Sequence, residues 1–133
     1  MAKDIPEAKY SWRPEEGVRS VSEVLMHVAG ANYFILSFAG LKMPEGMTED
    51  GEKNVTEKKA ILEFITKAYA YARDKITAMK DKDLEKMVDF FGTKLTTRHL
   101  LIKMADHNHE HLGQLIAYAR MNGITPSWSK KGN

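Results

Sequence analysis

Histidine is the residue type in this chain best suited to bind a metal ion. His107 and His111 lie four positions apart in the segment DHNHEHLGQ. In a helix this separation brings two side chains to one face, where both imidazoles can bind the same ion. His109 points to the other side of that helix, and we assign it, with His99, to the solvent-exposed surface. The alternative for the whole cluster is a solvated helix end that binds metal adventitiously.

The His107–His111 pair is predicted to face the protein interior. On a helical wheel, Leu100, Met104 and Tyr118 lie within about 60° of His107. Buried imidazoles need hydrogen-bond partners, and a bound cation is one way of satisfying both rings.

His27 shows the same behaviour in an earlier helical segment. It is a polar residue in an apolar stripe made of Val24, Ala31, Phe34, Ile35 and Phe38. Three inward histidines from two helices would form a three-nitrogen site with positions left open for water or substrate. That pattern is typical of catalytic rather than structural metal. The alternative is a core histidine whose hydrogen bonds are satisfied without metal.

Polar residues near these histidines have two interpretations each. Glu23 could orient His27 through a hydrogen bond, or it could serve only as a helix-capping residue. Asp106 and Glu110 flank the histidine pair and are expected to be solvated. Three further residues could supply donors or orient groups in a pocket but also fit packing positions: Tyr33, Tyr118 and Gln114.

Helices are expected to position all three histidines. The predicted elements are an extended lead-in over 1–19 and helices over about 20–41, 57–80, 83–90 and 97–121. The spacing of Ser20 and Glu23 predicts a capping box at the first helix, and Thr96 or Thr97 is the expected N-cap of the last. Residues 42–55 are expected to be a loop, because they combine one proline, two glycines and several charges.

Length and composition limit the class of protein. The 133 residues fit a single helical domain over 1–133. The chain has no cysteine, which excludes disulfides, cysteine-ligated zinc, iron–sulfur clusters and a cysteine nucleophile. A net charge of +2 without a basic stripe argues against a nucleic-acid partner. No apolar run reaches the ~20 residues of a membrane span, and no signal peptide opens the sequence, so a cytoplasmic location without membrane contact is expected.

Two segments resemble the signatures of the DinB-like, or YfiT-like, metalloenzyme family. In SWRPEEGVRSVSEVLMHVAGAN a histidine follows the start of a capped helix. In HNHEHLGQLIAYARMNGITP two histidines four apart precede Gly-Gln, an apolar turn, an Arg and a Gly–Pro exit. The resemblance covers most of the chain, from Ile5 to Trp128. It implies an all-α four-helix bundle that holds a divalent metal ion, usually zinc or nickel, at His27, His107 and His111.

The resemblance also implies a class of reaction. Relatives include thiol S-transferases that use bacillithiol and a mycothiol-dependent isomerase. The chain is therefore expected to be a metal-dependent transferase or hydrolase that activates a low-molecular-weight thiol or water for a small-molecule substrate. Any such thiol must come from a cosubstrate, because the protein has none. No catalytic acid or base stands out. The alternative is a non-catalytic, stress-related helical bundle, a binding or interaction protein whose metal is structural or absent.

One feature departs from the family pattern. Members normally carry a long helix before the segment PEAKYSW, and this chain starts almost on that segment. Three long helices and a short one would leave an apolar face open. We therefore expect that the sequence begins downstream of the natural start, or that a second copy covers this face in a homodimer. Some relatives with a similar beginning carry a secretion signal and the missing helix upstream, so a truncated start would allow a secreted or periplasmic form.

Overall fold

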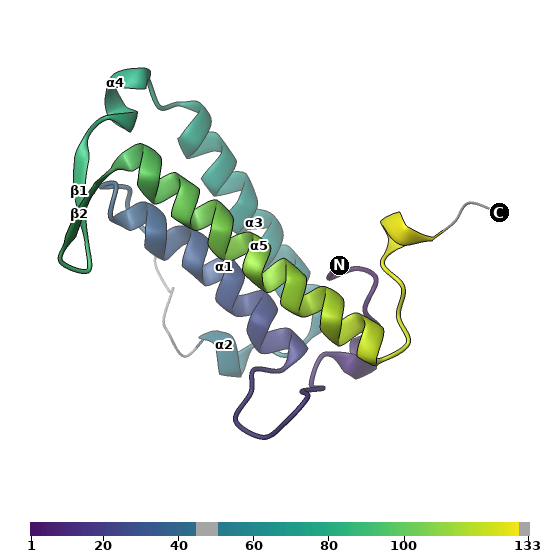
Figure 1. The fold of residues 1–133 in the computed structure, drawn as a ribbon. Coiled ribbons are helices and arrows are strands. Elements are labelled where there is room, and N and C mark those ends of the chain that lie inside the picture. Colours follow the sequence, from purple (N-terminus) through teal and green to yellow (C-terminus); the bar gives the residue numbers. More distant parts are fainter. Residues whose placement is uncertain (45–50, 131–133) are drawn as a thin grey trace.

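Three long helices form the protein, which we describe from a computed structural model covering residues 1–44 and 51–130. The helices are α1 (Val21–Ser37), α3 (Lys58–Thr77) and α5 (Thr97–Met121). They run side by side along the molecule, and α1 packs against both α3 and α5 (Figure 1). The short helix α2 (Gly51–Asn54) lies against α1. It falls within the predicted loop 42–55, of which residues 45–50 lie outside the described part.

The core is centred on α1, because this helix carries buried apolar residues on most of its surface. Val24, Ala29 and Leu36 are completely buried, as are Ile61 of α3 and Leu100 of α5. Burial of apolar area at about 25 cal/mol per Å² is the main force that holds the three helices together. Within the described residues, none of the helices has both the length and the apolarity required to cross a bilayer.

Sequence signals at the helix starts are confirmed. Ser20 and Glu23 form the predicted capping box: the Glu23 backbone N–H donates to Ser20 Oγ at 3.3 Å, and the Ser20 N–H donates to Glu23 Oε2 at 2.6 Å. Thr96 caps α5 through its side chain. The first helix ends at Ser37, earlier than the predicted end near residue 41, and the chain then turns through Gly40 at φ 80°.

The lead-in before α1 is folded against the bundle instead of extended. It contains a short 3-10 helix, η1 (Glu7–Lys9). Ile5 and Tyr10 are 1% and 2% exposed and belong to the same cluster as Ile61 of α3. These apolar side chains have no helical period, so the sequence pattern did not show that they reach the core.

The helix predicted over 83–90 is wrong for most of its length. Helix α4 (Asp81–Leu84) is followed by a hairpin of β1 (Met87–Phe90) and β2 (Thr93–Thr96), paired antiparallel. Phe91 and Gly92 form its two-residue turn with φ 54° and 80°. A two-residue turn with both φ values positive matches the twist of the paired strands.

Contacts with α1 explain why this segment forms a hairpin. Leu95 belongs to the buried cluster that contains Leu36, and Val88 and Phe90 pack against this cluster. The ring of Phe91 lies near Phe34 of α1 and near Phe38, the residue that directly follows this helix. Phe34 is nevertheless 43% exposed, so its predicted place in the buried stripe of α1 is wrong. Tertiary packing of alternate side chains, and not helical periodicity, determines the structure of this segment.

Candidate metal centre

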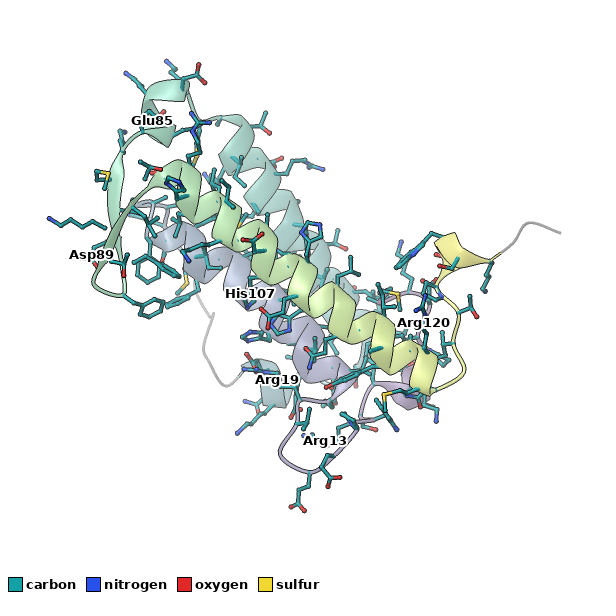
Figure 2. All side chains as sticks on the ribbon, in the orientation of Figure 1. Arg13, Arg19, Glu85, Asp89, His107 and Arg120 are labelled. Atoms are coloured by element: carbon teal, nitrogen blue, oxygen red, sulfur yellow. The ribbon has the colours of Figure 1, made fainter. Side chains whose placement is uncertain are left out.

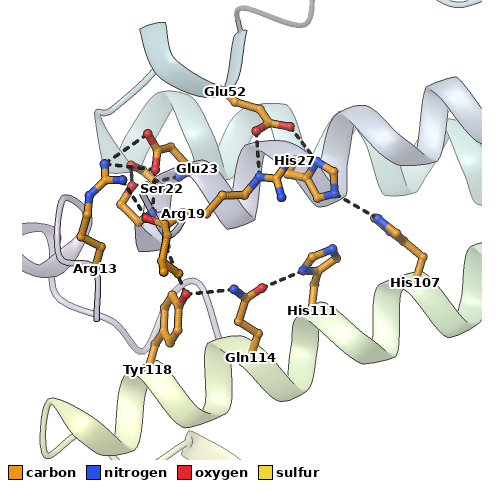
Figure 3. A network of polar contacts seen from close by, with 12 residues as sticks. Arg13, Arg19, Ser22, Glu23, His27, Glu52, His107, His111, Gln114 and Tyr118 are labelled. Carbon is orange, nitrogen blue, oxygen red and sulfur yellow. Dashed lines mark hydrogen bonds and ion pairs between the residues drawn. The ribbon is translucent and has the colours of Figure 1, made fainter. Parts of the chain in front are cut away.

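The structure brings His27, His107 and His111 together between α1 and α5. His107 and His111 lie one turn apart on α5, and His27 faces them from α1 (Figure 3). One nitrogen from each ring can be chosen so that no two lie more than 4.8 Å apart. The Nε2 atoms of His27 and His107 are 3.1 Å apart. The three rings therefore converge on one small volume.

Burial keeps the imidazoles of His27 and His107 in the form that binds metal. His111 is 9% exposed, and the other two rings are half-buried. Burial is the largest cause lowering the pKa of His27 and of His107 below the ordinary value for histidine. The hydrogen bond to Glu52 acts in the opposite direction on the pKa of His27, whereas the positive charge of Arg19 lowers both pKa values, and the net shift of each is downward. Both rings are thus neutral at pH 7, and a neutral imidazole has a nitrogen lone pair to offer to a cation.

Glu52 of α2 fixes the orientation of His27. Its Oε1 lies 2.6 Å from His27 Nδ1. The carboxylate accepts, so Nδ1 carries the proton and the Nε2 lone pair faces the other two histidines. Arg19 holds the carboxylate from its other side, with Nε 3.0 Å from Oε2. A carboxylate that receives the second N–H of a histidine is the usual partner of a metal-binding imidazole.

Gln114 orients His111 in the same way from α5. Its Oε1 lies 2.7 Å from His111 Nδ1, while its Nε2 donates to the Tyr118 hydroxyl at 2.9 Å. Tyr118 in turn donates to the Arg19 backbone carbonyl at 3.1 Å. The Nε2 of His111 is again left for a cation. Figure 3 shows that these bonds, together with those of Glu52, link His27 to His111 through a continuous polar chain.

The third ring, His107, differs from the other two. Its Nδ1 is buried and has no hydrogen-bond partner among the described residues, and its Nε2 faces His27 Nε2. Two neutral lone pairs repel at 3.1 Å unless a proton or a cation lies between them. Nitrogen ligands of tetrahedral zinc lie about 3.3 Å apart. The donor set and the His27–His107 separation therefore fit a divalent metal ion.

A polar contact beside the site aligns the two helices. Asn32, 1% exposed on α1, accepts from Asn108 Nδ2 on α5 at 2.8 Å. Tyr69 of α3 donates to Asn108 Oδ1 at 2.6 Å. Asn108 directly follows His107 in the chain, so this contact fixes the axial register of α5 against α1. The register determines the height at which His27 meets the histidine pair.

The surface assignments made from the sequence are confirmed. His99 and His109 are exposed. His99 Nδ1 lies 2.9 Å from Oγ1 of Thr96, the N-cap of α5, and His109 Nδ1 lies 2.8 Å from the Ala105 carbonyl oxygen on the same helix. Asp106 and Glu110 are exposed as well. Figure 2 shows His107 near the middle of α5, well away from Asp89, which marks the hairpin.

The structure decides between the two interpretations of each of the other polar residues. Glu23 serves the capping box and pairs with Arg13 instead of His27. Tyr33 is buried in an aromatic cluster with Phe64 and Tyr71. Gln114 and Tyr118 do reach the site, and Tyr118 is buried at the same time.

Sequence reasoning missed Glu52 and Arg19. Neither residue belongs to a periodic pattern: Glu52 is one of several charges in the predicted loop 42–55, and Arg19 precedes the first capping box. A cavity of about 480 Å³ does exist elsewhere, near the hairpin and lined in part by Phe38, Lys75 and Asp83, but no histidine lines it. The candidate site is therefore defined by its side chains and not by that cavity.

Comparison with known proteins agrees with this architecture. The family model of the DinB superfamily matches residues 1–115, so the chain belongs to the DinB superfamily. All three histidines of the site lie within the matched residues. The family resemblance of the two sequence signatures is thereby confirmed.

Individual relatives share the fold over nearly the whole chain. A crystal structure of a DinB-like protein from Bacillus cereus ATCC 10987 is 26% identical with a TM-score of 0.82, covering 94% of this chain and 83% of that one. The uncharacterized protein YjoA of Bacillus subtilis (strain 168) is 27% identical over 129 residues, which are 94% of this chain and 81% of YjoA. The crystal structure of YjoA superposes with a TM-score of 0.68 at 22% identity, again covering 94% and 83% of the two chains.

Proposed function

We propose that this protein is a metal-dependent enzyme that binds one divalent ion, zinc or nickel, through His27, His107 and His111. The observation that carries the proposal is the set of outer hydrogen bonds. Glu52 and Gln114 each accept from the Nδ1 of one histidine, which directs the Nε2 lone pairs of both toward the shared volume. A core histidine also needs a partner for its N–H, but here the two bonds leave both Nε2 atoms facing the volume that His107 Nε2 also reaches.

Three protein ligands favour catalysis over a structural role. A structural zinc site normally uses four protein ligands, whereas a catalytic site uses three and leaves a position for water or substrate. A divalent ion supplies Lewis acidity, which lowers the pKa of water or of a thiol at that position. The expected substrate is a small molecule, and a reacting thiol would be a low-molecular-weight cosubstrate because the chain has no cysteine.

The side chains of this protein then have distinct tasks. Glu52 and Gln114 hold two imidazoles in the tautomer that binds metal. Tyr118 keeps Gln114 in place and connects it to the backbone of Arg19. The partial exposure of His27 and Glu52, with side chains 23% and 28% exposed, supports access for a small molecule from the side of α2.

Metal content is the direct test of this proposal. We would purify the untagged protein without a chelating column and measure zinc and nickel per chain. We expect one ion per chain in the wild type and a loss of that ion in His111→Ala. His109→Ala is the matched control, because His109 lies on the same helix but is exposed and faces away. Absence of stoichiometric metal in the wild type, or full occupancy in His111→Ala, would contradict the proposal.

The reaction type needs a second experiment. The metal-loaded protein would be assayed for conjugation of an electrophile with several small thiols, with His111→Ala as the inactive reference. A metal-dependent rate with one thiol supports transfer. A null result with all thiols, with metal bound, would favour hydrolysis or a non-catalytic role.

A further inference from the structure

Arg19 lies at the edge of the candidate metal centre with part of its guanidinium unused. Its Nε pairs with Glu52, and its backbone carbonyl accepts from the buried hydroxyl of Tyr118. Both ends of the residue are therefore held in place. Within residues 1–44 and 51–130, no hydrogen bond occupies its two Nη groups, and its side chain is 44% exposed.

Arg13 provides an internal comparison. It is 40% exposed and also pairs with a carboxylate, that of Glu23, at 3.1 Å. Its terminal nitrogens, however, are committed to Glu23 and to the Val18 carbonyl. The two arginines thus have similar exposure and partners. Among the described residues, the Nη donors of Arg19 have no partner whereas those of Arg13 do, and the carboxylate that Arg19 contacts is the one that bonds His27.

Charge favours an anionic ligand at this place. Arg19 and Glu52 cancel each other, so a bound divalent ion leaves the immediate site positive. The positive charge of Arg19 is close enough to lower the pKa of both His27 and His107. Two parallel N–H donors of a guanidinium match the two oxygens of a carboxylate.

We propose that Arg19 is a specificity-determining residue that pairs with a carboxylate of the small molecule taken by this site, so that the preferred thiol is an anionic one. This inference rests on the proposed function. With a divalent ion held by His27, His107 and His111, the thiol would bind as thiolate and release its proton to the solvent. The carboxylate of the same molecule pairs with the Nη groups of Arg19. Thiolate and carboxylate together balance the charge of the divalent ion.

The test uses the full chain loaded with cobalt(II), because thiolate binding to cobalt gives a charge-transfer absorption. We would titrate 3-mercaptopropionate and 3-mercaptopropan-1-ol, two thiols of the same length that differ in the carboxylate. In the wild type we expect the carboxylate thiol to bind about tenfold more tightly. Arg19→Gln should bring the ratio of the two dissociation constants close to one. Arg13→Gln, the matched control, should keep the wild-type ratio.

The ratio within each variant separates recognition from changes in metal affinity or stability. Cobalt content and circular dichroism would be measured for each variant to verify loading and folding. Equal binding of the two thiols by the wild type, or a preference that survives in Arg19→Gln, would overturn this inference and leave the metal site standing. Failure of the wild type to bind cobalt would overturn the proposed function, and the inference with it.

Discussion

Removal of the Glu52 carboxylate should weaken metal binding without unfolding the protein. Glu52 accepts from His27 Nδ1 at 2.6 Å, and its side chain is 28% exposed. A hydrogen bond to a charged group contributes about 1.5–3 kcal/mol, and loss of such an outer partner lowers metal affinity about 10–100-fold. Because the carboxylate is partly solvated, we expect about tenfold for Glu52→Ala. Glu52→Gln, which keeps a neutral acceptor, should lose about threefold.

The assay is competition for zinc with a chromophoric chelator at fixed pH and ionic strength. The matched control is Glu110→Gln, since Glu110 is exposed on α5 and its charge acts on His107 without a hydrogen bond to any histidine of the site. We expect a change of less than about twofold there, because exposed charges are screened. Wild-type affinity in Glu52→Ala, or an equal loss in Glu110→Gln, would refute the reasoning that the Glu52–His27 bond orients a ligand.

Further predictions concern the outer shell of the site and the stability of the fold. Gln114→Glu, which places a carboxylate behind His111, should tighten zinc binding up to about tenfold in the same competition assay. Gly30→Ala should raise the free energy of unfolding by about 0.5–1 kcal/mol, because Gly30 is helical and an added Cβ meets open space. Gly92→Ala should lower the free energy of unfolding by about 1 kcal/mol, because Gly92 has a φ of 80°. Urea titrations that show the same sign for both variants would contradict this. Burial raises the pKa of Tyr10 to about 12, so the Tyr10 hydroxyl loses its proton at lower pH in the unfolded chain than in the folded one. The free energy of unfolding should therefore be unaffected below pH 10 and fall by up to about 2 kcal/mol as the pH rises from 10 toward 12. Tyr10→Phe should flatten this alkaline decline in urea titrations at pH 9 to 11, and an unchanged slope would count against it.

Several parts of the fold could be predicted from the sequence because their causes are local. The capping box of Ser20 and Glu23 lies within one helical turn, and Thr96 caps α5 through the N–H of His99. The hairpin could not be predicted in this way. Its strands have four residues each, and their alternate side chains are stabilised by α1, which is distant in the chain.

The sequence by itself determined which histidines share a face. The four-residue spacing of His107 and His111 places both on the inner side of α5, and the apolar neighbours of His27 direct it toward the same interior. These are consequences of helical periodicity and of apolar burial, so they hold before any tertiary contact is known.

Only the tertiary structure decided which residues support His27, whereas Gln114 supports His111 from three positions away on the same helix. Glu52 is 25 positions from His27, Arg19 is 33 positions from Glu52, and Tyr118 is 99 positions from Arg19. No periodic pattern connects such residues, because a hydrogen bond depends on where two backbones meet after the helices have packed. The physical reason is that helix formation and burial are set by neighbours along the chain, whereas the orientation of the His27 imidazole is set by a partner that the fold brings to it.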